Sequence, residues 1–238
     1  MKKLFTLVTA LAFLSSIAPA SQAGDEKPKE TQVKVSDESE RMTNSTTCLK
    51  EIIAIPEDGV PQSMFDNAAA IIVIPNLIKA GFIVGAKRGE GVMSVRNENG
   101  WTHPAFVHLT GGSLGWQVGV ESTDLILVFM SQKSVKALLN GEFTLGADAS
   151  VAAGPVGRTA SAGTNLSVKA EVYSYSRSRG VFAGIAVDGS NLGIDNDANS
   201  RYYGNGMTAN DVLFKAHSNT PKSANEFKLT LNGLTKKS

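Results

Sequence analysis

The chain has little of the chemistry that metal proteins and many enzymes need. Its 238 residues include one cysteine, Cys48, and three histidines, His103, His108 and His217. A single cysteine excludes an internal disulfide, and the histidines have neither His-Glu-x-x-His spacing nor a cysteine cluster that would complete a zinc site. We therefore predict no metal, no cofactor, and an inert thiol at Cys48, which falls within a structural helix.

Motifs for nucleotide, calcium and ester chemistry are also missing. The glycine-rich run 111–119 lacks the Gly-Lys-Ser/Thr ending of a P-loop, and a strand with a closely packed backbone explains it better. Residues 195–199 begin like a calcium loop, but Ser200 and Gly206 stand where that loop needs glycine and glutamate. Without a Gly-x-Ser-x-Gly elbow either, the sequence predicts no enzyme.

Only one hydrophobic run is long, and it begins near the first residue. Lys2 and Lys3 precede the apolar residues 4–18, and the small residues of 21–23 follow. The run is short for a bilayer span and leads into charged residues, which favours a cleavable signal peptide over 1–23 rather than an uncleaved anchor. We expect a secreted protein, periplasmic if the host is Gram-negative, with a polar, disordered leader over 24–36.

Neither sign of charge dominates the chain. It has 23 basic and 22 acidic residues, and removal of Lys2 and Lys3 with the signal leaves 21 basic residues and a net charge of −1. A nearly neutral chain is not a general polyanion binder, so we expect no nucleic-acid partner. Any attraction to phosphate must come from a local basic patch.

Residues 37–238 are predicted to form a single domain with helices at both ends. Apolar residues at helical spacing predict an amphipathic helix that starts at Asp37 and ends before Pro56. Its polar face mixes both charges, which favours packing on the protein's own core over docking on a membrane or partner. Capping boxes at Thr208 and Ser223 predict the last two helices.

Strands dominate the middle of the chain. Alternating and continuous apolar patterns predict a strand over 69–74 that Pro75 stops, and a strand over 143–151. Two hairpins are expected, one with its basic tip at 87–91 and one with its tip at 176–180. The fold class is α+β: a largely antiparallel sheet, with a barrel as one form it could take, and peripheral helices at both ends.

Short motifs in a fixed order resemble the SYLF domain family, from about Arg41 to the C-terminus, and a secreted bacterial member of it. The motifs are Ile74-Pro75, Lys79-Ala80-Gly81-Phe82, Gly89-Glu90-Gly91, Gly115 with Gln117-Val118-Gly119, Thr123-Asp124, Gly154-Pro155-Val156-Gly157-Arg158, Tyr173-Ser174-Tyr175-Ser176, Gly180-Val181-Phe182-Ala183-Gly184 and Tyr202-Tyr203-Gly204. The resemblance implies binding and not catalysis. Eukaryotic members are associated with phosphoinositides and actin filaments, and bacterial members are proposed to contact phospholipid. A bacterial signal peptide would exclude actin as a physiological partner.

The leading hypothesis is a lipid-binding module whose cations engage anionic phospholipid at a membrane surface. The predicted lipid-binding residues, mostly in expected turns, are Lys79, Lys87, Arg88, Arg158, Arg177 and Arg179.

Two alternatives stay open. The first is a structural or interaction protein of the cell envelope that binds a protein through its sheet edge or apolar helix. The second is a hydrolase with an unrecognised site, which would need a pocket that gathers Asp124, Asp148 or His108.

Overall fold

A computed structural model describes residues 36–53, 60–141, 143–155, 170–178, 181–185, 187–215 and 220–235. The predicted signal peptide lies outside the described residues, as does the predicted leader apart from Ser36. Arg158 and Arg179 also lie outside them. The fold described below is that of the compact unit Val35–Ser238.

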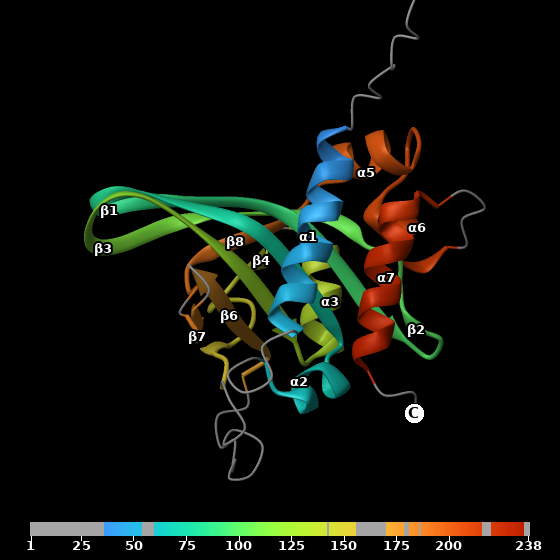
Figure 1. Cartoon of the computed structure of the whole chain (residues 1–238), viewed down its shortest axis with the longest axis horizontal. Coiled ribbons are helices and arrows are strands. Elements are labelled where there is room, and N and C mark those ends of the chain that lie inside the picture. Colours follow the sequence, from blue (N-terminus) through green and yellow to red (C-terminus); the bar gives the residue numbers. More distant parts are fainter. Residues whose placement is uncertain are drawn as a thin grey trace, which may run out of the picture. The chain divides into compact units, whose positions relative to one another are not determined.

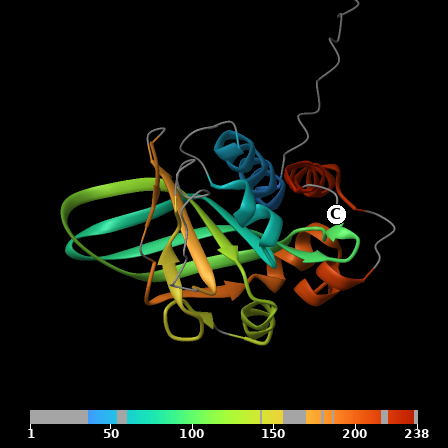
Figure 2. The same ribbon diagram turned by 90° about the horizontal axis from the view of Figure 1, so that it is seen from below.

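Two long antiparallel strands form the centre of the fold. β1 (Ala70–Asn97) and β3 (Ala105–Phe129) pair along almost their whole length, with β2 (Gly100–Trp101) on the last residues of β1. The register shifts between Ile74 and Leu77, and the strands curl, because a bulge adds local twist. The paired ribbons run away from the helices and turn back, as Figures 1 and 2 show.

Shorter strands extend the sheet on both halves of β3. β6 (Val172–Ser178) pairs antiparallel with the last part of β3, and β8 (Ser190–Ile194) pairs antiparallel with its first part. The others are β4 (Phe143–Thr144) on β8, β7 (Val181–Gly184) antiparallel to β6, and β5 (Val151–Ala153) parallel to β6. The predicted α+β class is confirmed: a mostly antiparallel sheet is strongly curled into a half-barrel.

Helices from both ends of the chain pack against this sheet. They are α1 (Asp37–Ile53), α2 (Gln62–Asn67), α3 (Gln132–Leu139), α5 (Asn196–Tyr203), α6 (Ala209–Phe214) and α7 (Lys222–Leu234). In Figure 2, α1 in blue and α7 in red lie together on one side of the sheet, and α3 in yellow-green lies on the other. The predicted packing of the first helix on the protein's own core is therefore confirmed.

The two faces of the curled sheet carry separate cores. The convex face places Ile71 and Ile126 against Leu49 of α1 and Phe227 of α7. The concave face is lined by alternate residues of both halves of β1 and by β3, and the apolar residues of α3 and α6 cover it. This alternation decides which face each polar residue of β1 occupies.

The predicted basic turn at 87–91 is wrong, because these residues lie within β1. Gly91 faces the first half of the same strand: a Cβ there would overlap the Val73 carbonyl oxygen and lie 2.8 Å from the Ile74 Cα. A Cβ at Gly89 would lie 2.5 Å from Ile74 Cγ2. These glycines let the two halves of β1 come close on the concave side, which explains glycine at positions where a turn was expected.

Pro75 does not end a strand either. It stands at the register shift in β1, where a ladder hydrogen bond is not needed, and Asn76 takes a φ of 53° there. The backbone N–H of Asn76 donates to Asp124 Oδ1 at 3.1 Å. A bulge with its own hydrogen-bond partner therefore carries the strand past the proline.

Other local predictions have mixed outcomes. The strand expected over 143–151 is broken between β4 and β5, because Asp148 turns the chain by accepting the Thr144 N–H at 2.7 Å. Helix α7 begins after Pro221 and not at a Ser223 cap. The capping box of Thr208 with Asp211 is confirmed, and so is the hairpin of β6 and β7, but Ser176, Arg177 and Ser178 of its expected tip lie in β6.

Candidate functional site

The structure separates the predicted lipid-binding cations that it describes. Arg177 lies in β6 and donates to Asp124 Oδ2 at 2.9 Å and to Glu51. Arg88 lies on the convex side of β1, with its side chain 73% exposed, and contacts Glu90 at 3.3 Å. The expectation that Arg177 extends freely from a loop tip is wrong, because two carboxylates already pair with it.

Lys79 and Lys87, in contrast, come together on the concave face. The first and second halves of β1 each contribute one, and the charge of Lys79 lowers the pKa of Lys87 after the larger effect of burial. Only 7% of Lys87 is exposed. A Cβ at Gly111, its partner across the ladder, would lie 2.9 Å from Lys87 Cε, so the glycine makes room for the lysine stem.

The Lys87 ammonium group has no hydrogen-bond or ion-pair partner among the described residues. The negative charge of Asp188 partly opposes the lowering of the Lys87 pKa. Glu121 stands opposite Lys79 in the ladder. Neither carboxylate forms an ion pair with these two lysines. A largely buried lysine without a bonded counter-ion is unusual, because withdrawing an unpaired charge from water is costly, and water still reaches this ammonium group. We call Lys79 and Lys87 the concave lysine pair.

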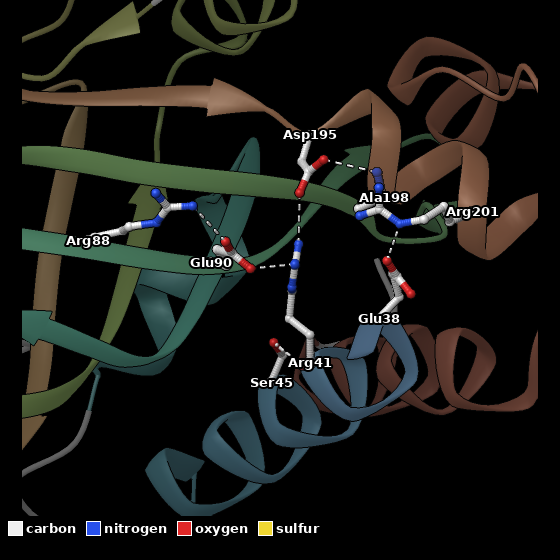
Figure 3. Close-up of polar contacts among 8 residues, drawn as sticks. All are labelled: Glu38, Arg41, Ser45, Arg88, Glu90, Asp195, Ala198 and Arg201. Carbon is white, nitrogen blue, oxygen red and sulfur yellow. Dashed lines mark hydrogen bonds and ion pairs between the residues drawn. The ribbon is translucent and has the colours of Figure 1, made fainter. Parts of the chain in front are cut away.

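A second polar cluster joins α1 to the sheet (Figure 3). The Arg41 side chain, 11% exposed, donates to Asp195 Oδ2 at 3.0 Å and to Glu90, and its guanidinium carbon lies 5.3 Å from the Phe106 ring centroid. Beside it, Arg201 Nε donates to Glu38 Oε1 at 2.6 Å. The cluster connects α1, β1 and α5, three elements that are far apart in sequence.

Asp195 has two functions in this cluster. Its Oδ1 accepts the Ala198 N–H at 2.9 Å as the N-cap of α5, and its Oδ2 accepts from Arg41. Burial opposes ionisation of Asp195, but the Ala198 N–H and Arg41 outweigh it, so its pKa lies below the ordinary value. This saturated arrangement holds α1 in place and leaves Arg41 little capacity for a ligand.

Sequence reasoning missed this cluster, although a signal was present. Arg41 shares a helical stripe with Ser45, Cys48 and Ile52, all of which are buried. A lone arginine on the buried stripe of an amphipathic helix requires carboxylate partners. The sequence could therefore have flagged Arg41, though not which carboxylates it meets.

A cavity of about 530 Å³ lies beside this cluster, between the first turns of α1 and the convex side of β1. Arg41, Arg88 and Glu90 line it together with Ile78, which is 49% exposed. Val120, 76% exposed, lies diagonally across the ladder from Ile78. The convex face thus continues from the cavity as an uncovered apolar strip.

The residues proposed for a hydrolase do not converge. Asp124 pairs with Arg177, Asp148 accepts a backbone N–H, and His108 lines a different cleft that neither aspartate touches. Within the described ranges, no group of three His, Cys, Asp or Glu residues is placed to hold a metal ion. None of the described helices combines the length and the apolar character needed to cross a membrane.

The sequence is similar to a family model and to known proteins. The family model described as "Ysc84: Las17-binding protein actin regulator" matches residues 110–234. LAS seventeen-binding protein 3 of Saccharomyces cerevisiae (strain ATCC 204508 / S288c) is 36% identical over 158 residues, which are 65% of this chain and 34% of that protein. SH3 domain-containing YSC84-like protein 1 of Mus musculus is 33% identical over 184 residues, 76% of this chain and 54% of that protein. The chain spans between about a third and about half of the length of these curated relatives, and neither name describes an enzyme.

Proposed function

The chain belongs to the Ysc84 family, the SYLF family that its motifs resemble, and from this premise we propose that it binds anionic phospholipid without catalysis. The headgroup phosphate is held by the concave lysine pair. The observation that carries the proposal is Lys87, a largely buried residue whose ammonium group is still reached by solvent and has no bonded counter-ion among the described residues. A phosphate supplies both the negative charge and the acceptor oxygens that this group lacks.

The two lysines have different tasks in this arrangement. Lys79 is partly exposed, so it meets the headgroup first and attracts it through solvent. Lys87 is deeper, so its contact with phosphate is less screened by salt. Arg88 and Arg177 do not belong to this site, because one lies on the opposite face and the other is already paired.

Vesicle sedimentation tests the proposal with the whole chain. We expect binding to phosphatidylglycerol-containing vesicles but not to pure phosphatidylcholine, with weaker binding at about 300 mM than at about 50 mM salt. Lys79→Gln and Lys87→Gln should each reduce the bound fraction severalfold. Lys133→Gln, which removes an exposed lysine of α3, is the matched control and should bind as the parent does. Equal, negligible sedimentation with both vesicle types would refute the lipid proposal.

A protein partner is the second candidate, and the exposed Ile78 and Val120 favour it. The relatives named for binding Las17 are also consistent with a protein-binding role. The double variant Ile78→Glu/Val120→Glu should abolish capture of a specific, stoichiometric protein from an extract of the host while leaving vesicle binding unchanged. If the variant captures the same protein equally well, the apolar strip of Ile78 and Val120 is not the binding surface.

We also propose that the protein is secreted. If the signal peptide is cleaved after Ala23, the protein isolated from its host has Gly24 as its first residue, which N-terminal mass spectrometry can determine.

A further inference from the structure

A cleft of about 480 Å³ lies away from the concave lysine pair. It opens where β3 and β8 meet the end of α3 and the start of α6. Its polar lining consists of His108 and side chains with amides or a hydroxyl, and its apolar lining of Leu139, Ile194 and Ala209. Among the described residues no charged side chain lines it, although 19% of the chain's residues are charged. The site is therefore not suited to phosphate.

The cleft depends on a glycine. Gly193 stands opposite His108 in the ladder between β3 and β8, and a Cβ there would lie 2.6 Å from His108 Nε2. Any side chain at this position would displace the imidazole. Since Gly193 has an ordinary φ, room for the His108 ring is the reason for glycine here.

Several polar groups in the cleft have unused hydrogen-bonding capacity. The side chains of His108, Asn140 and Asn210 make no hydrogen bond with any other described residue. Asn196 uses its Oδ1 to accept the Ala209 N–H at 2.9 Å, which leaves its amide NH2 free within the described structure. Together they offer donors and acceptors side by side, as a ligand hydroxyl requires, since a hydroxyl both donates and accepts.

We propose that this cleft binds an uncharged, hydroxyl-rich group of the size of a sugar ring. The amides and the imidazole form hydrogen bonds with the hydroxyls. Leu139, Ile194 and Ala209 contact the apolar face of the ring, which its C–H groups form. The volume lies within the usual range for small-molecule sites. The group comes either from a free sugar or polyol or from the headgroup of a glycolipid, and both have the same hydroxyl chemistry.

The test is a titration of the full chain with glucose, N-acetylglucosamine, myo-inositol and glycerol, followed by NMR. At least one probe should shift the His108 ring and Asn210 amide signals in a saturable manner, with a Kd on the order of millimolar. Inorganic phosphate should not compete. Vesicles that contain glycosylated lipid should displace the free sugar if the natural source is a headgroup, and leave it bound if the source is a free sugar.

Two variants locate the site. Asn210→Ala, at an exposed position, should weaken binding about tenfold, the loss of roughly 1.4 kcal/mol. Gly193→Ala should displace His108 and abolish binding. His103→Ala, which changes a histidine outside the cleft, is the control. The proposal is overturned if no probe shifts these signals at about 50 mM, or if a folded Asn210→Ala protein binds as tightly as the parent. Lys87→Gln should leave sugar binding intact, so this test is independent of the lipid proposal.

Discussion

Arg41 shows how one charged residue can fix the position of a helix. Its guanidinium lies between Glu90 and Asp195 with the Phe106 ring beside it, and water reaches little of it. Replacing it with methionine keeps much of the apolar contact but leaves Asp195 without its ion-pair partner and Glu90 with only the exposed Arg88. We expect Arg41→Met to lower the free energy of unfolding by about 3 kcal/mol, measured by urea denaturation.

Arg88→Met is the matched control for this substitution. Arg88 also meets Glu90, but its side chain is 73% exposed, so the loss should not exceed about 1 kcal/mol. A similar loss for both variants would show that the position of Arg41 between α1 and the sheet is not important.

Arg41 should also govern the acid sensitivity of the fold. The folded-state pKa of Asp195 lies below its ordinary value despite burial, because the Ala198 N–H and Arg41 favour the carboxylate. A carboxyl group whose pKa is lowered by folding contributes stability above its unfolded-state pKa. That contribution is lost as the pH falls through its folded-state pKa. Stability should therefore decline between about pH 5 and about pH 2, and Arg41→Met should decline less steeply. Urea midpoints across this pH range measure the slope, and parallel curves would contradict the assignment.

Gly91 allows the two halves of β1 to approach each other closely. Because a Cβ there would meet backbone atoms of Val73 and Ile74, which no rotamer change can move away, Gly91→Ala should cost about 3 kcal/mol. Gly112→Ala is the control, since no atom of the described residues lies within 4 Å of its added Cβ, and it should change stability by less than about 0.5 kcal/mol. Urea denaturation compares the two, and a neutral Gly91→Ala would disprove the close approach.

At the scale of elements, local signals predicted the type of an element better than its length. Asp37 begins the first helix and Thr208 caps α6, because apolar periodicity and capping are local properties. The sequence predicts the central strands as short pieces, because proline and glycine, here Pro75 and Gly89, usually interrupt strands. In the structure, a bulge accommodates Pro75, and the close approach of the two halves of β1 requires Gly89. Both features depend on the long-range pairing of β1 with β3, which the local sequence does not show.

For the candidate site, too, the sequence predicts the types of the residues better than their positions in the fold. The sequence identified Lys79 and Lys87 as cations, but which face each occupies depends on the continuity of β1. The local pattern places Arg177 in a hairpin, but neighbouring residues do not predict its carboxylate partners in α1 and β3. Pairing with distant residues, and not residue type, separates a structural arginine from a lysine available to a ligand.

Arg177 should hold the end of α1 onto the sheet. It connects Glu51 of the helix with Asp124 of β3, and its side chain is only 21% exposed. We expect Arg177→Gln to speed amide hydrogen exchange in the last turn of α1 at least severalfold, because this turn loses its ionic contact with the sheet. Lys50→Gln breaks an exposed pair with Glu226 and should leave exchange nearly unchanged. Equal rates in the parent and Arg177→Gln would contradict this role.

For the whole molecule, the family match covers less than the folding unit. Residues 110–234 include most of β3 but neither α1 nor β1. Without β1, most of one edge of β3 has no hydrogen-bond partner, and the convex core loses Leu49 and Ile71. A sheet edge of that length and an uncovered apolar face favour aggregation.

The fragment 110–234 should therefore fail to fold on its own. We expect poorly dispersed amide signals in its NMR spectrum and no cooperative thermal transition, since the lost pairing and burial far exceed the marginal stability of a domain. The chain 36–238, which keeps α1 and β1, should unfold cooperatively under the same conditions. A cooperative transition of the shorter fragment would mean that β1 is an addition to the domain. If the fragment 110–234 does not fold and the chain 36–238 does, then β1, including Lys79 and Lys87, is part of the smallest unit that folds.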